Sequence, residues 1–166
     1  MIPISNTDTQ PRTARTLVLG MGNTLMRDDG VGIHAVRAFR TQCGASCAHV
    51  AVEETAVAGP GLTTLLSGYK EAIIVDALLT RDSRPGAIHV LDLADLDHTR
   101  NTVSPHSMNL ATAVELGRRC ELPMPHRIRI VAVEIADAVN VGETCTPAVQ
   151  EAISKVVDIL NDICIK

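Results

Sequence analysis

Residues 71–77 of this chain read Glu-Ala-Ile-Ile-Val-Asp-Ala, a short apolar run that carries one carboxylate near its end. An apolar run of this length, without polar alternation, is typical of a strand with both faces covered, as in a parallel sheet. Such strands alternate with helices along the chain because the helices cover the two faces. Residues 71–77 therefore predict a strand of an α/β sheet that is covered on both faces.

Alternating strand and helix patterns continue on both sides of this segment. Thr146 is expected to cap the last helix, with Pro147 as its first residue. The sequence predicts a three-layer α/β/α sandwich with a mostly parallel sheet of about five strands, formed by residues 15–166 as a single domain after a flexible tail at residues 1–14. The other expected strands are 16–21, 49–53, 87–91 and 127–135, and the expected helices are 31–42, 62–68, 105–120 and 147–163.

Composition excludes several classes of partner. The 166 residues include one Phe, one Tyr and no Trp, and the net charge is −4. Aromatic platforms for stacking bases and basic clusters for phosphates are both missing, which argues against nucleic acid. No apolar stretch approaches the ~18 residues that span a membrane, and from the polar residues 1–15 we expect no secretory signal. Five cysteines at scattered spacings indicate reduced thiols and a cytoplasmic location.

The segment 20–30, Gly-Met-Gly-Asn-Thr-Leu-Met-Arg-Asp-Asp-Gly, follows the first expected strand. It resembles a dinucleotide-binding loop only superficially, because the third glycine of that motif would fall at Leu25 and paired aspartates would repel phosphates. We therefore expect no nucleotide. Asp28 and Asp29 have two open interpretations: capping of the following helix, or ligands in a cleft.

Two further polar residues are expected near the same edge of the sheet. Asp76 is expected to lie at the end of its strand. Ser104 and Pro105 are typical of a helix start, which would place His106 in the first turn of that helix. The positive end of a helix dipole disfavours imidazolium, so this ring would stay neutral and able to bind a metal. Both residues also have ordinary structural interpretations. The remaining histidines, expected only in surface or core roles, are His34, His49, His89, His98 and His126.

Together these signals converge on one cleft. Ligands bind outside the carboxyl ends of the strands in such sheets. If the ends lie side by side, Asp29, Asp76 and His106 would present two carboxylates and one imidazole. That set, with open positions left over, suits a divalent first-row metal such as nickel or zinc. The chain carries no Gly-x-Ser-x-Gly elbow, His-Glu-x-x-His helix or obvious catalytic cysteine.

At these residues the chain resembles the nickel–iron hydrogenase maturation proteases, a family of small cytoplasmic α/β endopeptidases. The opening GMGNTLMRDDGVG matches the family's Gly-x-Gly-Asn…Asp-Asp/Glu-x-x-Gly signature, and the resemblance extends from about Thr16 to Ile163. It also includes Val75-Asp76-Ala77, the helix start at 104–106, and Thr146-Pro147-Ala148-Val149. The resemblance implies that Asp29, Asp76 and His106 ligate the metal.

The resemblance further implies an endopeptidase that removes the C-terminal extension of a hydrogenase large-subunit precursor. Nickel would arrive with the precursor and would not be a resident cofactor, although zinc or cadmium could occupy the same site. We hypothesise that the metal held by Asp29, Asp76 and His106 polarises the scissile carbonyl or activates water. The alternative is that it only positions the precursor while a carboxylate acts as base.

One segment departs from the family pattern. An Asp followed by a Gly-Thr-x-Gly-like turn usually follows the second strand, whereas this chain reads Glu-Glu-Thr-Ala-Val-Ala-Gly at 53–59. Glu54 is the candidate replacement for that Asp. The residues expected to shape the substrate path are Gly22, Asn23, Asp28, Glu54 and Gly59.

Two other functions compete with the protease. One is a metal-binding maturation chaperone that holds the precursor without cutting it. The other is a small-molecule enzyme with a Rossmann-like site. Shortening of the precursor would separate the first from a protease, and nucleotide titration would reveal the second.

Overall fold

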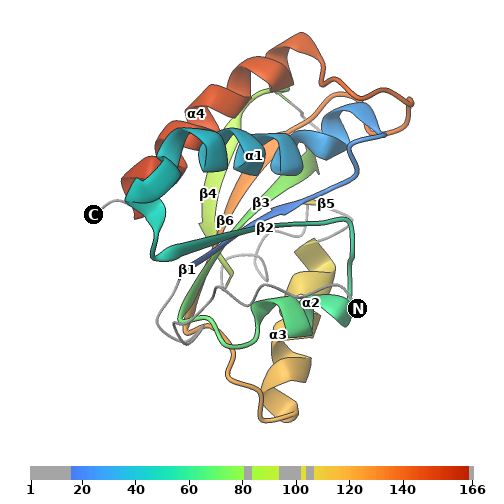
Figure 1. Ribbon diagram of the computed structural model, residues 1–166. Coiled ribbons are helices and arrows are strands. Elements are labelled where there is room, and N and C mark those ends of the chain that lie inside the picture. Colours follow the sequence, from blue (N-terminus) through green and yellow to red (C-terminus); the bar gives the residue numbers. More distant parts are fainter. Residues whose placement is uncertain (1–15, 81–83, 94–101, 104–106, 165–166) are drawn as a thin grey trace, which may run out of the picture.

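The computed structural model describes residues 16–80, 84–93, 102–103 and 107–164. A twisted sheet lies between two layers of helices (Figure 1), so the predicted α/β/α sandwich is confirmed. No helix within the described residues is long and apolar enough to cross a membrane. The strands are β1 (Thr16–Met21), β2 (Val50–Thr55), β3 (Glu71–Thr80), β4 (Ile88–Asp92), β5 (Thr102–Val103) and β6 (Arg127–Glu134); the helices are η2 (Arg27–Gly30), α1 (Val31–Cys43), η3 (Gly44–Cys47), α2 (Gly61–Leu66), α3 (Ser107–Arg119) and α4 (Pro147–Cys164).

The sheet has the strand order β2-β1-β3-β6-β4. All neighbours along this path are parallel except β4, which runs antiparallel to β6. The two-residue strand β5 pairs antiparallel with the far end of β3, through Leu79 and Thr80. β3 is therefore the central strand, and its continuous apolar run fits a strand with both faces covered.

Two aliphatic cores cover the two faces of the sheet. On one face α1 and α4 pack over alternate strand residues such as Val18, Val75 and Val133. On the other face α2 and α3 pack over the intervening residues, such as Leu19 and Ile74. Figure 1 shows these helix pairs on opposite sides of the sheet. Successive side chains along each strand thus lie on opposite faces of the sheet.

Two glycines allow α1 to approach the sheet closely. A Cβ at Gly32 would overlap the carbonyl oxygens of Met21 and Val75, at the ends of β1 and in β3. A Cβ at Gly20 would overlap the carbonyl of Gly32 and the side chain of Val36. The first turn of α1 therefore rests directly on the backbone of β1 and β3, which fixes the loop that precedes it.

The structure also corrects one expectation about strand ends. β3 continues to Thr80, so Asp76 lies inside the strand and does not close it. The register places Gly20 of β1 beside Val75, so Asp76 is nevertheless level with the last residue of β1. Asp76 therefore still lies beside the carboxyl end of β1, although β3 itself continues for four more residues.

Candidate active site

The sheet has a topological switch point between β1 and β3. After β1 the chain passes to β2 on one side, and after β3 it passes to β4 and β6 on the other side. In open α/β sheets ligands bind in the crevice outside the carboxyl ends of the strands at such a point. Asp29 follows β1 in η2, which contacts β3, and Asp76 lies on β3 itself. Both acidic residues singled out from the sequence are thus at the switch point.

Asp29 holds the loop that leaves β1. Its Oδ2 accepts a hydrogen bond of 2.8 Å from the backbone N–H of Asn23, and the side-chain oxygen of Asn23 accepts one of 3.0 Å from Leu25 N–H. Gly22 has φ +138°, and a Cβ there would overlap the carbonyl oxygen of Asp29. Gly22 and Asn23 therefore let the loop fold back onto Asp29, which gives a structural reason for these two residue types.

Asp28 is fully buried and joins this loop to the start of α4. Its carboxylate accepts hydrogen bonds from the backbone N–H groups of Ala136 (3.1 Å), Asp137 (3.0 Å) and Thr146 (2.6 Å), and from the Thr146 hydroxyl (2.9 Å). The N-cap residues of η2 and α1, Met26 and Gly30, make no side-chain cap hydrogen bond, and the Asp28 carboxylate binds backbone N–H groups that follow β6. Thr146 precedes α4 as predicted, but its hydroxyl binds Asp28.

Backbone contacts make the two loops a single unit. Arg27 N–H donates to the carbonyl of Gly142 (2.8 Å), and Gly142 N–H donates to Leu25 (3.0 Å). The Arg27 guanidinium also contacts Asp137 at 3.1 Å. Hydrogen bonds from the side chain and backbone of Asn140 hold the pKa of Asp137 well below its usual range. The loop that carries Asp29 is therefore rigidly attached to the loop between β6 and α4.

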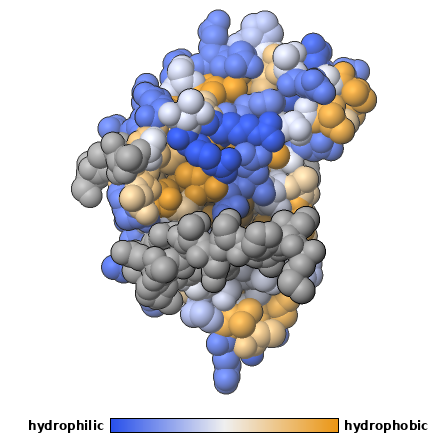
Figure 2. All heavy atoms as spheres, in the orientation of Figure 1, coloured by the Kyte–Doolittle hydropathy of each residue, from blue (hydrophilic) through white to orange (hydrophobic). Residues whose placement is uncertain are grey.

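The joined loops carry exposed aliphatic side chains. Leu25 is 56% exposed, and Val139 and Val141 are each 82% exposed. Figure 2 shows apolar side chains at the end of the molecule where the β6–α4 loop lies in Figure 1. The rim beside Asp29 thus offers apolar surface next to polar groups.

A cysteine also lies at this junction, but it is poorly suited to nucleophilic catalysis. The Cys145 thiol contacts the carbonyl of Arg27 at 3.7 Å. Burial, reinforced by the neighbouring Asp28 carboxylate, raises the pKa of this thiol to about 11. Since the thiolate is the reactive form of cysteine, Cys145 remains protonated and inert at neutral pH.

Asp76 is buried on the face of the sheet covered by α2 and α3. Its neighbours in sequence, Val75 and Ala77, belong to the opposite core, whereas Ile74 and Leu78 share its face. The residue is 2% exposed, and its Oδ1 accepts a 2.9 Å hydrogen bond from Ala77 N–H. A carboxylate buried within a strand is costly and needs compensating partners, so Asp76 is an unusual residue at the switch point.

His106 lies outside the described residues, so the expected grouping of Asp29, Asp76 and His106 stays a prediction. β5 ends at Val103 beside Leu79 of β3, and α3 begins at Ser107. Within the described residues no three His, Cys, Asp or Glu side chains are placed to share a metal ion. The two aspartates alone therefore do not make a complete site.

Glu54, the candidate replacement for the family's Asp, is engaged in an ion-pair cluster. Its carboxylate accepts hydrogen bonds from Arg37 (2.8 and 3.0 Å) and Arg40 (3.3 Å), both on α1. The hydrogen bonds from Arg37 lower the pKa of Glu54 despite its partial burial. Glu54 thus joins β2 to α1, on the face opposite to Asp76. Gly59, with φ +72°, forms the turn before α2.

Comparisons with known proteins identify the family. The family described as hydrogenase maturation protease matches residues 34–163 of this chain. The chain belongs to that family. The match starts at His34, so it contains Asp76 but not the loop of Asp29. The resemblance expected from the sequence motifs is confirmed.

Individual relatives of this maturation protease agree in fold and length. The hydrogenase 2 maturation protease of Escherichia coli K12 is 28% identical over 140 residues, which cover 84% of each chain. The structure of the hydrogenase maturating endopeptidase HybD from E. coli superposes with a TM-score of 0.75, at 24% identity over 90% of this chain and 91% of that one. The [NiFe] hydrogenase maturation protease HybD from Thermococcus kodakarensis gives 0.70, at 21% identity over 90% and 99%.

The structure of this maturation protease pairs two residues that the sequence did not connect. His89 on β4 lies 2.8 Å from the Glu134 carboxylate on β6, through Nε2 and Oε1. The sequence assigned His89 to a surface or core role and placed Glu134 within the expected strand 127–135 without a role of its own. The available signal was a charged residue at an otherwise apolar strand position, but the sequence does not reveal that β4 pairs with β6.

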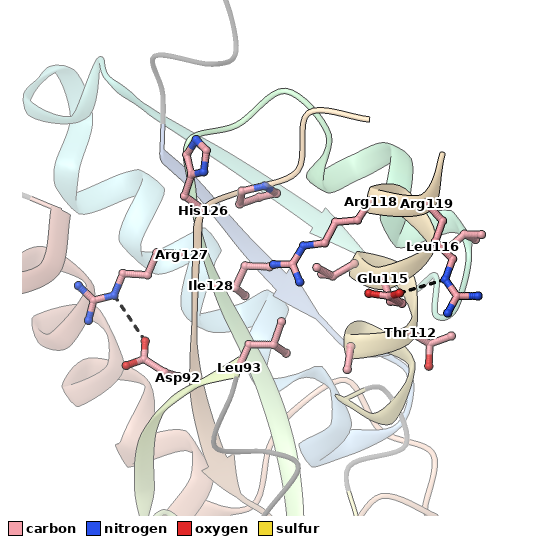
Figure 3. Close-up of a pocket in the computed structure, with 13 residues that line it drawn as sticks. Asp92, Leu93, Thr112, Glu115, Leu116, Arg118, Arg119, His126, Arg127 and Ile128 are labelled. Atoms are coloured by element: carbon pink, nitrogen blue, oxygen red, sulfur yellow. Dashed lines mark hydrogen bonds and ion pairs between the residues drawn. The ribbon is translucent and has the colours of Figure 1, made fainter. Parts of the chain in front are cut away.

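A large groove in the described structure lies away from the switch point. It has a volume of about 1020 Å³ and runs between α3, the start of β6 and the end of β4. Figure 3 shows Arg127 pointing to Asp92 and Arg119 to Glu115, with ion-pair distances of 3.5 and 3.0 Å. Because β6 begins at Arg127, this groove is at the amino end of the parallel strands. It is not the candidate active site.

Loss of the Asp28 carboxylate should destabilise the maturation protease strongly. Asp28→Asn would place an amide NH₂ among donors that now point at two carboxylate oxygens, leaving at least one buried donor unsatisfied. We expect the free energy of unfolding to fall by about 2–4 kcal/mol, measured by urea denaturation. Asp158→Asn, the same change at an exposed position of α4, should shift it by less than about 0.5 kcal/mol. Equal stabilities of the two variants would contradict this role.

Proposed function

We propose that this maturation protease is an endopeptidase that removes the C-terminal extension of a nickel-loaded [NiFe]-hydrogenase large-subunit precursor. The observation that carries the proposal is the buried carboxylate of Asp76 at the β1/β3 switch point, with Asp29 on the adjacent rigid loop. Family membership supplies the reaction class, and the site supplies residues that could recognise a metal-bearing substrate. The proposal places the reaction in the cytoplasm.

The donor chemistry of the candidate site suits nickel. Carboxylate oxygens and an imidazole nitrogen bind nickel, zinc or cadmium, and three protein ligands leave positions for groups of the precursor. His106 is the proposed third ligand beside Asp29 and Asp76. The three residues from Val103 to His106 span at most about 11 Å, and Val103 pairs with Leu79, three residues beyond Asp76. The chain is therefore long enough to bring His106 to Asp76.

In this proposal nickel is part of the substrate and not a resident cofactor. A precursor whose nickel is in place offers open coordination positions, and Asp29, Asp76 and His106 fill them. Binding through the metal then orients the C-terminal segment next to it, and the nickel supplies Lewis acidity toward the scissile carbonyl. An empty precursor offers no nickel for these three ligands, so it binds weakly.

Gly22, Asn23 and Gly59 are proposed to admit the extended C-terminal segment. Gly22 and Asn23 form the turn that Asp29 holds, and Gly59 forms the turn after β2. Asp28 is proposed to act only by fixing that turn, since its carboxylate is buried and fully engaged. Glu54 is proposed to position β2 through α1 and not to contact the substrate.

Mass spectrometry of the precursor tests this function. Purified protein is incubated with nickel-loaded and nickel-free precursor, and intact masses are measured over time. We expect only the nickel-loaded precursor to lose a C-terminal fragment. Equal shortening of both forms would remove nickel from recognition. A stable complex without any shortening would favour the alternative, a maturation chaperone that binds metal but does not cleave.

A further inference from the structure

A histidine–carboxylate pair lies on the same face of the sheet as Asp76. The Nε2 of His89 and the Oε1 of Glu134 are 2.8 Å apart, and the second carboxylate oxygen of Glu134 accepts a hydrogen bond from the backbone N–H of Arg84. The Glu134 side chain is 8% exposed, whereas the His89 side chain is 43% exposed. One member of the pair is therefore fixed in the protein and the other reaches the surface.

The surroundings of Glu134 determine which nitrogen of His89 carries the hydrogen. Burial opposes ionisation, but hydrogen bonds from the Arg84 backbone and from His89 outweigh it and lower the pKa of Glu134. An ionised carboxylate only accepts hydrogen bonds, so Nε2 of His89 must be the donor. The lone pair of the neutral ring is then on Nδ1, which accepts no hydrogen bond from any residue that the structure describes.

The strand register places this pair close to Asp76. Asp76 of β3 is paired with Ala132 of β6, and Ala132 is paired with His89 of β4. Ala132 belongs to the core under α2 and α3, so the three side chains of this row share one face. Neighbouring strands are about 4.8 Å apart, which puts the Cα atoms of Asp76 and His89 about 10 Å apart. The small side chain of Ala132 lies between them.

A purely structural role explains the pair less well. The turn before β4 is already held by backbone hydrogen bonds of 2.8 Å, from Gly86 N–H to the Glu134 carbonyl and from Glu134 N–H to Ala87. Glu134 also holds the turn through Arg84 N–H, but the imidazole of His89 takes no part in closing it. A shared metal site is also disfavoured, because Asp76, Glu134 and His89 are not close enough together to bind one ion. An oriented imidazole with a free lone pair, one strand beyond Ala132, has the features of a general base.

We propose that His89 is the general base and acid for peptide-bond hydrolysis beside Asp76, with Glu134 as its positioning residue. This inference rests on the proposed function. Nδ1 of His89 takes a proton from water as the water oxygen attacks the scissile carbonyl carbon. When the C–N bond breaks, the same nitrogen gives that proton to the leaving amine. Glu134 keeps Nε2–H in place throughout and stabilises the transient imidazolium.

The test separates cleavage from binding. Single-turnover cleavage of nickel-loaded precursor and the affinity for it are measured for wild type, His89→Gln and His89→Ala. Glutamine can still donate to Glu134 but is not basic. We expect a rate about 10²–10³-fold lower in both variants, with affinity within about twofold of wild type. Added imidazole should restore part of the rate in His89→Ala.

His126→Gln is the matched control, because this histidine lines the groove at the opposite edge of the sheet. It should cleave at the wild-type rate. A wild-type rate in His89→Gln, or a rate loss matched by an equal loss of affinity, would overturn the assignment of His89. An uncut precursor with wild-type protein would instead overturn the proposed function, so the two failures are distinguishable.

Discussion

Asp76→Asn is expected to lower the rate of cleavage of nickel-loaded precursor by about 10²–10³-fold while the protein remains folded. Asparagine has nearly the shape of aspartate, so the packing around this 2% exposed side chain is kept. The lost negative charge removes a ligand for the substrate's nickel, and such metal contacts contribute several kcal/mol. Each 1.36 kcal/mol corresponds to a tenfold change in rate.

The measurement combines intact-mass analysis of the precursor with circular dichroism of the variant. Asp92→Asn is the matched control, since it makes the same chemical change at the end of β4, where Asp92 faces Arg127 at the opposite edge of the sheet. That variant should cleave normally. Full activity of Asp76→Asn would show that this carboxylate does not contact the metal or the reacting groups.

Gly32→Ala is expected to destabilise the fold by about 3 kcal/mol. In an ordinary helix this substitution stabilises by up to about 1 kcal/mol, because glycine costs more backbone entropy. Here the new Cβ would overlap the carbonyl oxygens of Met21 and Val75, which belong to the sheet backbone and cannot rotate away. The helix must therefore lift from β1 and β3, with the cost of overpacking.

Urea denaturation of Gly32→Ala and Gly117→Ala measures this difference. Gly117 lies in α3, and its Cβ would meet the side chain of Met124, which is flexible and can move. We expect Gly117→Ala to change the free energy of unfolding by less than about 1 kcal/mol. If both variants had the same stability, backbone contact would not be the reason for glycine at position 32.

The sequence predicts the elements of this fold better than their arrangement. The limits expected for β1 and for the start of α1 agree with the structure, because apolar periodicity and glycine placement are local signals. The insertion of β6 between β3 and β4, and the antiparallel direction of β4, depend on contacts between distant residues. The short strand β5 was not predicted, since two residues carry no periodicity.

In the candidate site, too, local signals could be recognised from the sequence and contacts between distant residues could not. Asp29 and Asp76 could be recognised because acidic residues next to apolar strands are locally unusual. The role of Asp28 could not, because its partners at 136, 137 and 146 are more than 100 residues away in sequence. His89 and Glu134 were missed for the same reason, because they are 45 positions apart in sequence.

The central position of β6 also has a consequence for synthesis on the ribosome. While the nascent chain ends before residue 127, the β3 edge that pairs with β6 is open, and β4 lacks the only strand partner it has within the described residues. The groups at 136, 137 and 146 that bind the Asp28 carboxylate are also not yet made. Unpaired edges favour aggregation. The loop bearing Asp29 can thus be locked only after the β6–α4 segment emerges, so an incomplete polypeptide is not expected to engage a hydrogenase precursor.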